Sequence, residues 1–118
     1  MDRAEFEAVV DEVLAELPEW VVERIDNLHV VVEERPTRAQ IEKHGNLLGL
    51  YEGVSLTRRG PISYAGAMPD RITIFRGPHL RIASDREQLR RRIATTVVHE
   101  VGHHIGISYE RHPEQGWA

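Results

Sequence analysis

The chain has 118 residues, of which 41% are hydrophobic and 29% charged, and its formal net charge is -4. This size and balance are typical of one globular domain, so we expect residues 1–118 to form a single domain. The acidic balance argues against nucleic-acid binding, and the absence of cysteine excludes disulfides, cysteine-ligated zinc and thiol nucleophiles. No apolar run approaches the roughly 20 residues that span a bilayer, so we expect no membrane contact. Acidic residues throughout 1–17 exclude a signal peptide there, and we expect a cytoplasmic protein.

The first half of the chain begins with an amphipathic pattern. Residues 2–17 repeat apolar side chains at spacings of three and four, which predicts a helix with Asp2 as its N-cap. The Val-rich residues 28–34 predict a strand. Residues 39–48 fit no single pattern, and glycines interrupt the stretch that follows. We expect loops there, with one short strand at 48–51.

The second half gives clearer signals. Residues 71–76, RITIFR, alternate apolar and polar side chains and predict a strand, which Gly77-Pro78 should end. The sequence SDRE at 84–87 is a capping box, so a helix should begin near Asp85. Its apolar residues recur to Ile105, and Gly106 should end it. The order of helix, strand, loops, strand and helix predicts an α+β domain.

The candidate metal-binding and catalytic residues lie in HEVGHHIG, residues 99–106. There His99, Glu100 and His103 have the spacing HExxH. Positions i and i+4 of a helix share one face, so both imidazoles can bind one Zn²⁺ ion. Glu100 beside them can act as general base toward a water that the metal activates. Gly106 lets the chain leave the helix and return a third ligand. The alternative is a solvated helix end whose histidines interact with the helix dipole.

At this point the sequence resembles a family, the small bacterial zincin-like metallopeptidases. The resemblance covers LLGLYEGVSLT at 47–57, PDRITIFRGP at 69–78 and VVHEVGHHIGIS at 97–108. It implies a minimal zincin-like fold, in which a small twisted sheet packs on a backing helix and an active-site helix. It also implies a zinc-dependent metallopeptidase that hydrolyses peptide bonds, with His99 and His103 as metal ligands and Glu100 as the catalytic base.

The third metal ligand is open at this stage. The family motif, HExxHxxGxxD, has aspartate where this chain has Tyr109, and a phenol is a poor ligand until the metal removes its proton. We expect Glu110 to take this role. The other candidates are Tyr109 itself and three residues near it, which are His104, His112 and Glu114.

The walls of a peptide cleft are the second open question. We expect the strand at 72–75 to pair with a peptide or unfolded polypeptide through a free edge. Residues 107–118 offer little material for the opposite wall, so a partner or an oligomer can complete the cleft. The alternative functions are a degenerate zincin that binds metal or peptide without efficient turnover, and an interaction module without metal.

A few polar aromatic residues outside the motif are also candidates. Tyr51 and Tyr64 can donate a hydrogen bond to an oxyanion, although a half-buried packing role is the simpler interpretation. We interpret His29, His44 and His79 as surface or packing histidines rather than ligands.

Overall fold

The computed structural model of the protein describes residues 1–53 and 69–106. These residues form five helices and three strands. In chain order they are α1 (Arg3–Ala15), α2 (Glu19–Val22), β1 (Leu28–Glu33), α3 (Arg38–His44), β2 (Gly49–Glu52), β3 (Asp70–Phe75), α4 (Arg76–Ile82) and α5 (Arg86–Ile105). The predicted α+β class is confirmed.

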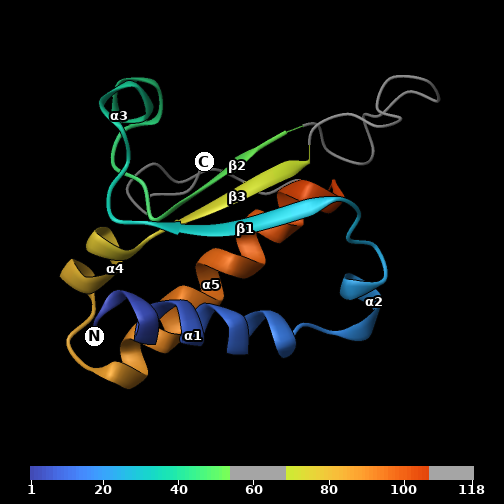
Figure 1. The fold of residues 1–118 in the computed structure, drawn as a ribbon, viewed down its shortest axis with the longest axis horizontal. Coiled ribbons are helices and arrows are strands. Elements are labelled where there is room, and N and C mark those ends of the chain that lie inside the picture. The colour runs from blue at the N-terminus through green and yellow to red at the C-terminus, as the bar shows by residue number, and fades with distance from the viewer. Residues whose placement is uncertain (54–68, 107–118) are drawn as a thin grey trace.

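The three strands form one mixed sheet with the order β1-β3-β2 (Figure 1). β1 runs parallel to β3, with Val30 opposite Ile72, and β2 runs antiparallel to β3, with Tyr51 opposite Ile72. β3 is therefore the central strand and is hydrogen-bonded on both sides. The prediction that residues 72–75 offer a free edge is wrong, because alternation along a strand shows which faces it has but not which neighbours it pairs with. In the described part of the chain, β1 and β2 are the two edge strands.

Both faces of β3 are buried. Ile72 and Ile74 lie in the main hydrophobic core, whereas Phe75 joins a smaller cluster on the other face of the sheet. The strand therefore alternates between two cores rather than between core and solvent.

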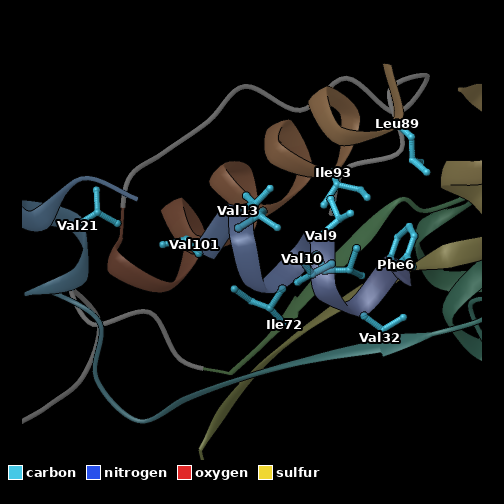
Figure 2. Close-up of a cluster of buried hydrophobic side chains, with 12 residues drawn as sticks. Phe6, Val9, Val10, Val13, Val21, Val32, Ile72, Leu89, Ile93 and Val101 are labelled. Atoms are coloured by element: carbon cyan, nitrogen blue, oxygen red, sulfur yellow. The ribbon is translucent and has the colours of Figure 1, made fainter. Parts of the chain in front are cut away.

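The helices α1 and α5 pack side by side against one face of the sheet (Figure 1). Between them and the sheet lies the main core, which Figure 2 shows in close-up. Its buried members come from both helices and the sheet and include Phe6, Val9, Val10, Val13, Val32, Ile72, Ile74, Leu89, Ile93, Val97 and Val101. Since these are mostly Val, Ile and Leu, the core is aliphatic, and it fixes α5 firmly under the sheet.

The start of α1 agrees with the sequence, whereas the short helices α2, α3 and α4 were not predicted. The Asp2 side chain accepts a hydrogen bond of 2.8 Å from the Glu5 backbone N–H, as predicted for an N-cap. α3 begins with a capping box between Thr37 and Gln40, a signal present in the sequence as TRAQ. α4 contains Gly77 and Pro78, which were predicted to end β3 in a turn. Proline is tolerated there because the backbone N–H groups in the first turn of a helix have no hydrogen-bond partner within the helix.

α5 is the longest helix and holds the HExxH residues. Its N-cap is Asp85, whose side chain accepts a 2.7 Å hydrogen bond from the Gln88 backbone N–H. The capping pair is thus one residue later than the predicted Ser84–Glu87 box. The helix ends as predicted, with Gly106 in the left-handed conformation at φ 92°. None of the helices in residues 1–53 and 69–106 has the length and apolar character needed to cross a membrane.

Candidate metal centre

The last two turns of α5 bring His99, Glu100 and His103 together. Candidate ligand atoms of the three side chains all lie within 4.8 Å of one another. The buried face of α5, which includes Val97 and Val101, packs into the core and fixes the rotation of the helix about its axis. The polar residues between these apolar positions are therefore held in one orientation.

The two imidazole rings converge. His99 Nε2 and His103 Nε2 are 3.1 Å apart, and the ring planes meet at 80° with centroids 4.7 Å apart. Two ligands of a tetrahedral zinc ion, at about 2.0–2.1 Å from the metal, are separated by roughly 3.3 Å. The observed spacing is close to this value, so the two nitrogens fit one divalent ion. A ring nitrogen of each neutral imidazole has a lone pair to offer such an ion.

Glu100 lies on the sheet side of this pair and is 0% exposed, while His99 is 3% exposed. Gly49 of β2 lies close to the Glu100 side chain of α5. A Cβ atom at Gly49 would lie 3.2 Å from Glu100 Cγ and 2.6 Å from Thr96 Cγ2. Glycine is thus required at this point for the edge strand to approach the helix, and the approach fixes the Glu100 side chain between them.

His104 follows His103 directly but does not belong to the same cluster. Its Nδ1 is 2.9 Å from Asp70 Oδ2, and its Nε2 accepts a 3.1 Å hydrogen bond from the Asp26 backbone N–H. Both ring nitrogens are therefore bound within the fold, and the ring is 0% exposed. His104 is not available as the third ligand, because consecutive helical residues point about 100° apart.

The ring of Tyr51 in β2 contacts the rings of both neighbouring histidines, His103 and His104. Its ring is parallel to that of His103, with centroids 6.2 Å apart and an interplanar angle of 3°. Its hydroxyl donates a 2.5 Å hydrogen bond to Asp70 Oδ2. The hydroxyl is thus directed to a buried carboxylate, so the hypothesis that Tyr51 donates to an oxyanion is not supported. Sequence reasoning missed Asp70, because nothing in the residues next to it shows that its side chain contacts Tyr51 and His104.

His79 of α4 is a packing histidine, as predicted. It is 0% exposed, with Nδ1 2.7 Å from the Phe75 carbonyl oxygen and Nε2 2.9 Å from Thr96 Oγ1. Burial lowers the pKa of this imidazole below its usual value, because the charged form loses its hydration. The Thr96 hydroxyl also donates a 3.0 Å hydrogen bond to the Arg92 carbonyl oxygen, so both ring nitrogens of His79 lie in a buried hydrogen-bonded network.

Several predicted residues fall outside the described part of the chain. These are Tyr64 and the other candidates for the third ligand, Glu110, Tyr109, His112 and Glu114. The assignment of Glu110 as a ligand stays a prediction. Within the described residues, the site consists of two converging imidazoles and a buried carboxylate under the edge strand of a small mixed sheet.

Two histidines at metal-ligand spacing on a helix, with a buried glutamate beside them under a small sheet, form a cluster that could hold a metal ion. The chain matches the model of the zincin-like metallopeptidase family over residues 25–117, which is most of its length. The protein therefore belongs to the zincin-like metallopeptidase family, and the resemblance noted in the sequence is confirmed.

One solved structure extends this comparison to the fold. It is a conserved hypothetical protein from Thermus thermophilus, 24% identical, which aligns over 88% of this chain and 94% of its own with a TM-score of 0.58. At that identity the likeness shows a shared fold alone. The comparison with curated proteins gives no match.

Proposed function

We propose that the protein is a zinc-dependent metallopeptidase that hydrolyses peptide bonds at the HExxH turn of α5. His99 and His103 are the metal ligands in this proposal, and Glu100 is the general base. The observation that carries it is the convergence of His99 Nε2 and His103 Nε2 to 3.1 Å beside the Glu100 carboxylate. Membership of the zincin-like metallopeptidase family supports zinc as the metal and peptides as the substrate.

Each side chain then has one task. Zinc, when bound, supplies a Lewis acid that polarises a carbonyl oxygen and lowers the pKa of a water. His99 and His103 hold the ion from one helical turn, which keeps the two ligands at a fixed spacing. Glu100 accepts the proton of the attacking water and passes it to the leaving amine. The contact of Gly49 with the Glu100 side chain restricts the positions that this carboxylate can adopt.

The third ligand in this proposal is Glu110, with Tyr109, His112 and Glu114 as the alternatives. Gly106 supports a return of the chain toward the metal, because its left-handed conformation turns the backbone away from the helix axis. One ion is proposed, since the described residues bring together one His/Glu cluster of ligand spacing.

The substrate in this proposal is a peptide or an unfolded polypeptide in extended form. The strand that supports this is β2 rather than β3, because β2 lies at an edge of the described sheet and directly over Glu100. An extended peptide can add to such an edge through backbone hydrogen bonds. A partner or a second copy of the chain completes the cleft if residues 107–118 do not.

A second candidate function is binding without efficient turnover. It is favoured by the burial of the site, since Glu100 is 0% exposed and His99 is 3% exposed. A general base has to lie within hydrogen-bond reach of its water, so the catalytic proposal requires substrate or metal binding to open this space. The two functions differ in one measurable property, which is turnover by the metal-loaded protein.

The deciding experiment uses the full chain, loaded with one equivalent of Zn²⁺ and incubated with a broad peptide library. We expect cleavage that a chelator abolishes and that added zinc restores. Glu100→Gln should remove cleavage while elemental analysis still finds one zinc per chain. Glu87→Gln, at an exposed glutamate of the same helix, is the matched control and should cleave normally. Stoichiometric zinc in the wild-type protein with no cleavage of any library peptide would favour the second candidate.

A further inference from the structure

We propose that Tyr51 is a positioning residue for the metal ligand His103, and that the buried pair of Asp70 and His104 holds Tyr51 in place. The proposal rests on the proposed role of His103 as a metal ligand. It assigns different tasks to the two adjacent histidines of α5. His103 would bind the ion, and His104 would anchor the side chain that orients His103.

The first observation is the contact between Tyr51 and His103. The two rings are within 3° of parallel, and their centroids are 6.2 Å apart, which is an offset stack. The imidazole of a histidine can otherwise turn about its χ2 bond in a broad energy well. A flat neighbour on one face restricts this rotation. Tyr51 therefore favours the ring plane in which His103 Nε2 can lie 3.1 Å from His99 Nε2.

The second observation is that Tyr51 is itself fixed at its far end. Its hydroxyl donates a 2.5 Å hydrogen bond to Asp70 Oδ2, and the Asp70 side chain is 1% exposed. Hydrogen bonds to an ionised carboxylate are shorter and about twice as strong as those between neutral groups. Asp70 is the first residue of β3 and pairs with Leu28 of β1, so the carboxylate is carried by the central strand of the sheet.

The third observation is the orientation of His104. The Asp26 backbone N–H donates to His104 Nε2, which leaves the ring proton on Nδ1, directed at Asp70 Oδ2. The same carboxylate oxygen thus receives hydrogen bonds from both His104 and Tyr51. The His104 ring also meets the Tyr51 ring edge-on, with centroids 6.0 Å apart and planes at 66°. Tyr51 is consequently in contact with both histidines, one on its face and one at its edge.

Gly53 supports the assignment independently. A Cβ atom at Gly53 would overlap the Asp70 carboxylate, and the residue has a φ of 153°. Only glycine leaves room for the carboxylate at this place. The end of β2 is therefore shaped to accept Asp70 beside Tyr51.

The strength of the proposed effect follows from other metal sites. Groups that orient a ligand without contacting the metal commonly change metal affinity by about 10- to 100-fold when they are mutated. A purely structural role for Tyr51 would instead change the stability of the fold and leave the affinity of the folded protein for zinc unchanged. The experiment therefore has to separate affinity from stability.

The first measurement is the zinc affinity of the full chain, taken by competition with a chromophoric chelator. Tyr51→Phe keeps the ring and removes the hydroxyl, and Asp70→Asn keeps the shape and removes the charge. We expect each to weaken zinc binding about tenfold. Val10→Ala, in the core on α1, is the control that lowers stability without touching the site. Wild-type affinity in Tyr51→Phe, or an equal loss in Val10→Ala, would overturn the proposal.

The second measurement needs no metal. In the metal-free wild-type protein, NMR should show NOEs between the ring protons of Tyr51 and His103 and a single orientation of the His103 ring. In Tyr51→Phe we expect the His103 ring signals to broaden or shift toward an averaged position. Absence of the wild-type NOEs, or an unchanged His103 ring in Tyr51→Phe, contradicts the positioning role. A wild-type protein that shows these NOEs but binds no zinc refutes the proposed function and leaves the ring contact standing.

Discussion

Gly49 of β2 lies against Glu100 of α5, with no room between them for a side chain. A Cβ atom at Gly49 would be 2.6 Å from Thr96 Cγ2 and 3.2 Å from Glu100 Cγ. The backbone of the edge strand therefore lies directly against the side chains of the HExxH turn at this point.

Gly49→Ala should force β2 away from α5. We expect a loss of about 1–3 kcal/mol in the free energy of unfolding, the usual effect of overpacking, together with reduced peptide cleavage. Urea unfolding and the peptide assay measure the two effects. Gly45→Ala is the matched control, because a Cβ atom there would meet nothing within 4 Å and only the φ of 81° is strained. Because Gly45 combines φ 81° with ψ -160°, a conformation adopted almost only by glycine, the variant should lower stability by about 1–3 kcal/mol and leave cleavage unchanged. Full activity and full stability in Gly49→Ala would refute the close contact.

Replacing the two adjacent histidines of α5 should affect two different properties, which are the stability of the fold for His104 and zinc binding for His103. His104→Ala removes a fully buried ring and one of the hydrogen bonds to Asp70, so we expect a loss of about 2–4 kcal/mol in the free energy of unfolding. His103→Ala removes a partly exposed ring and should change the stability of the metal-free protein by less than about 1 kcal/mol. Only His103→Ala should abolish zinc binding in the folded protein. Equal stability losses in the two variants would contradict this division of roles.

His79 should make the protein less stable in mild acid. Its pKa in the folded state lies below the usual 6.5 because of burial, so the unfolded chain binds the proton more readily. The contribution of the neutral His79 ring to the free energy of unfolding is fully present above pH 6.5 and is lost as the pH falls below that value. Each pH unit below it should lower the free energy of unfolding by up to about 1.4 kcal/mol. The measurement is urea unfolding from about pH 7.5 to about pH 5.5 in wild type and His79→Asn, a range that brackets the usual imidazole pKa. The variant should show a shallower dependence on pH, and parallel curves would count against the assignment.

Zinc should stabilise the fold through mass action. At a free zinc concentration about 100 times the dissociation constant, we expect a gain of about 2.7 kcal/mol in the free energy of unfolding. A chelator should reverse the gain. Glu100→Gln should retain it, because that side chain is proposed as a base and not as a ligand, whereas His99→Ala should lose it. Stabilisation by zinc that survives the loss of His99 would place the metal elsewhere.

The features that the sequence determined are those that depend on residues close to one another along the chain. The amphipathic repeat of α1, the alternation of β3 and the capped apolar repeat of α5 each report local geometry, and each appears within a few residues of its predicted bounds. The HExxH spacing likewise fixes His99 and His103 on one face of α5, since the helical repeat alone sets their separation. Gly106 ends that helix in the predicted left-handed conformation.

The features that only the tertiary structure decided depend on residues far apart in the chain. Whether β2 or β3 lies at an edge of the sheet depends on strand pairing, and the residue pattern of a single strand does not show which strands it pairs with. The hydrogen bonds of Asp70 with Tyr51 and His104 join residues of β2, β3 and α5 that are distant in sequence. His104 looks like a ligand in the sequence because it follows His103, yet folding directs it to a buried carboxylate. A contact of this kind arises from packing a helix against a sheet, and no local repeat encodes it.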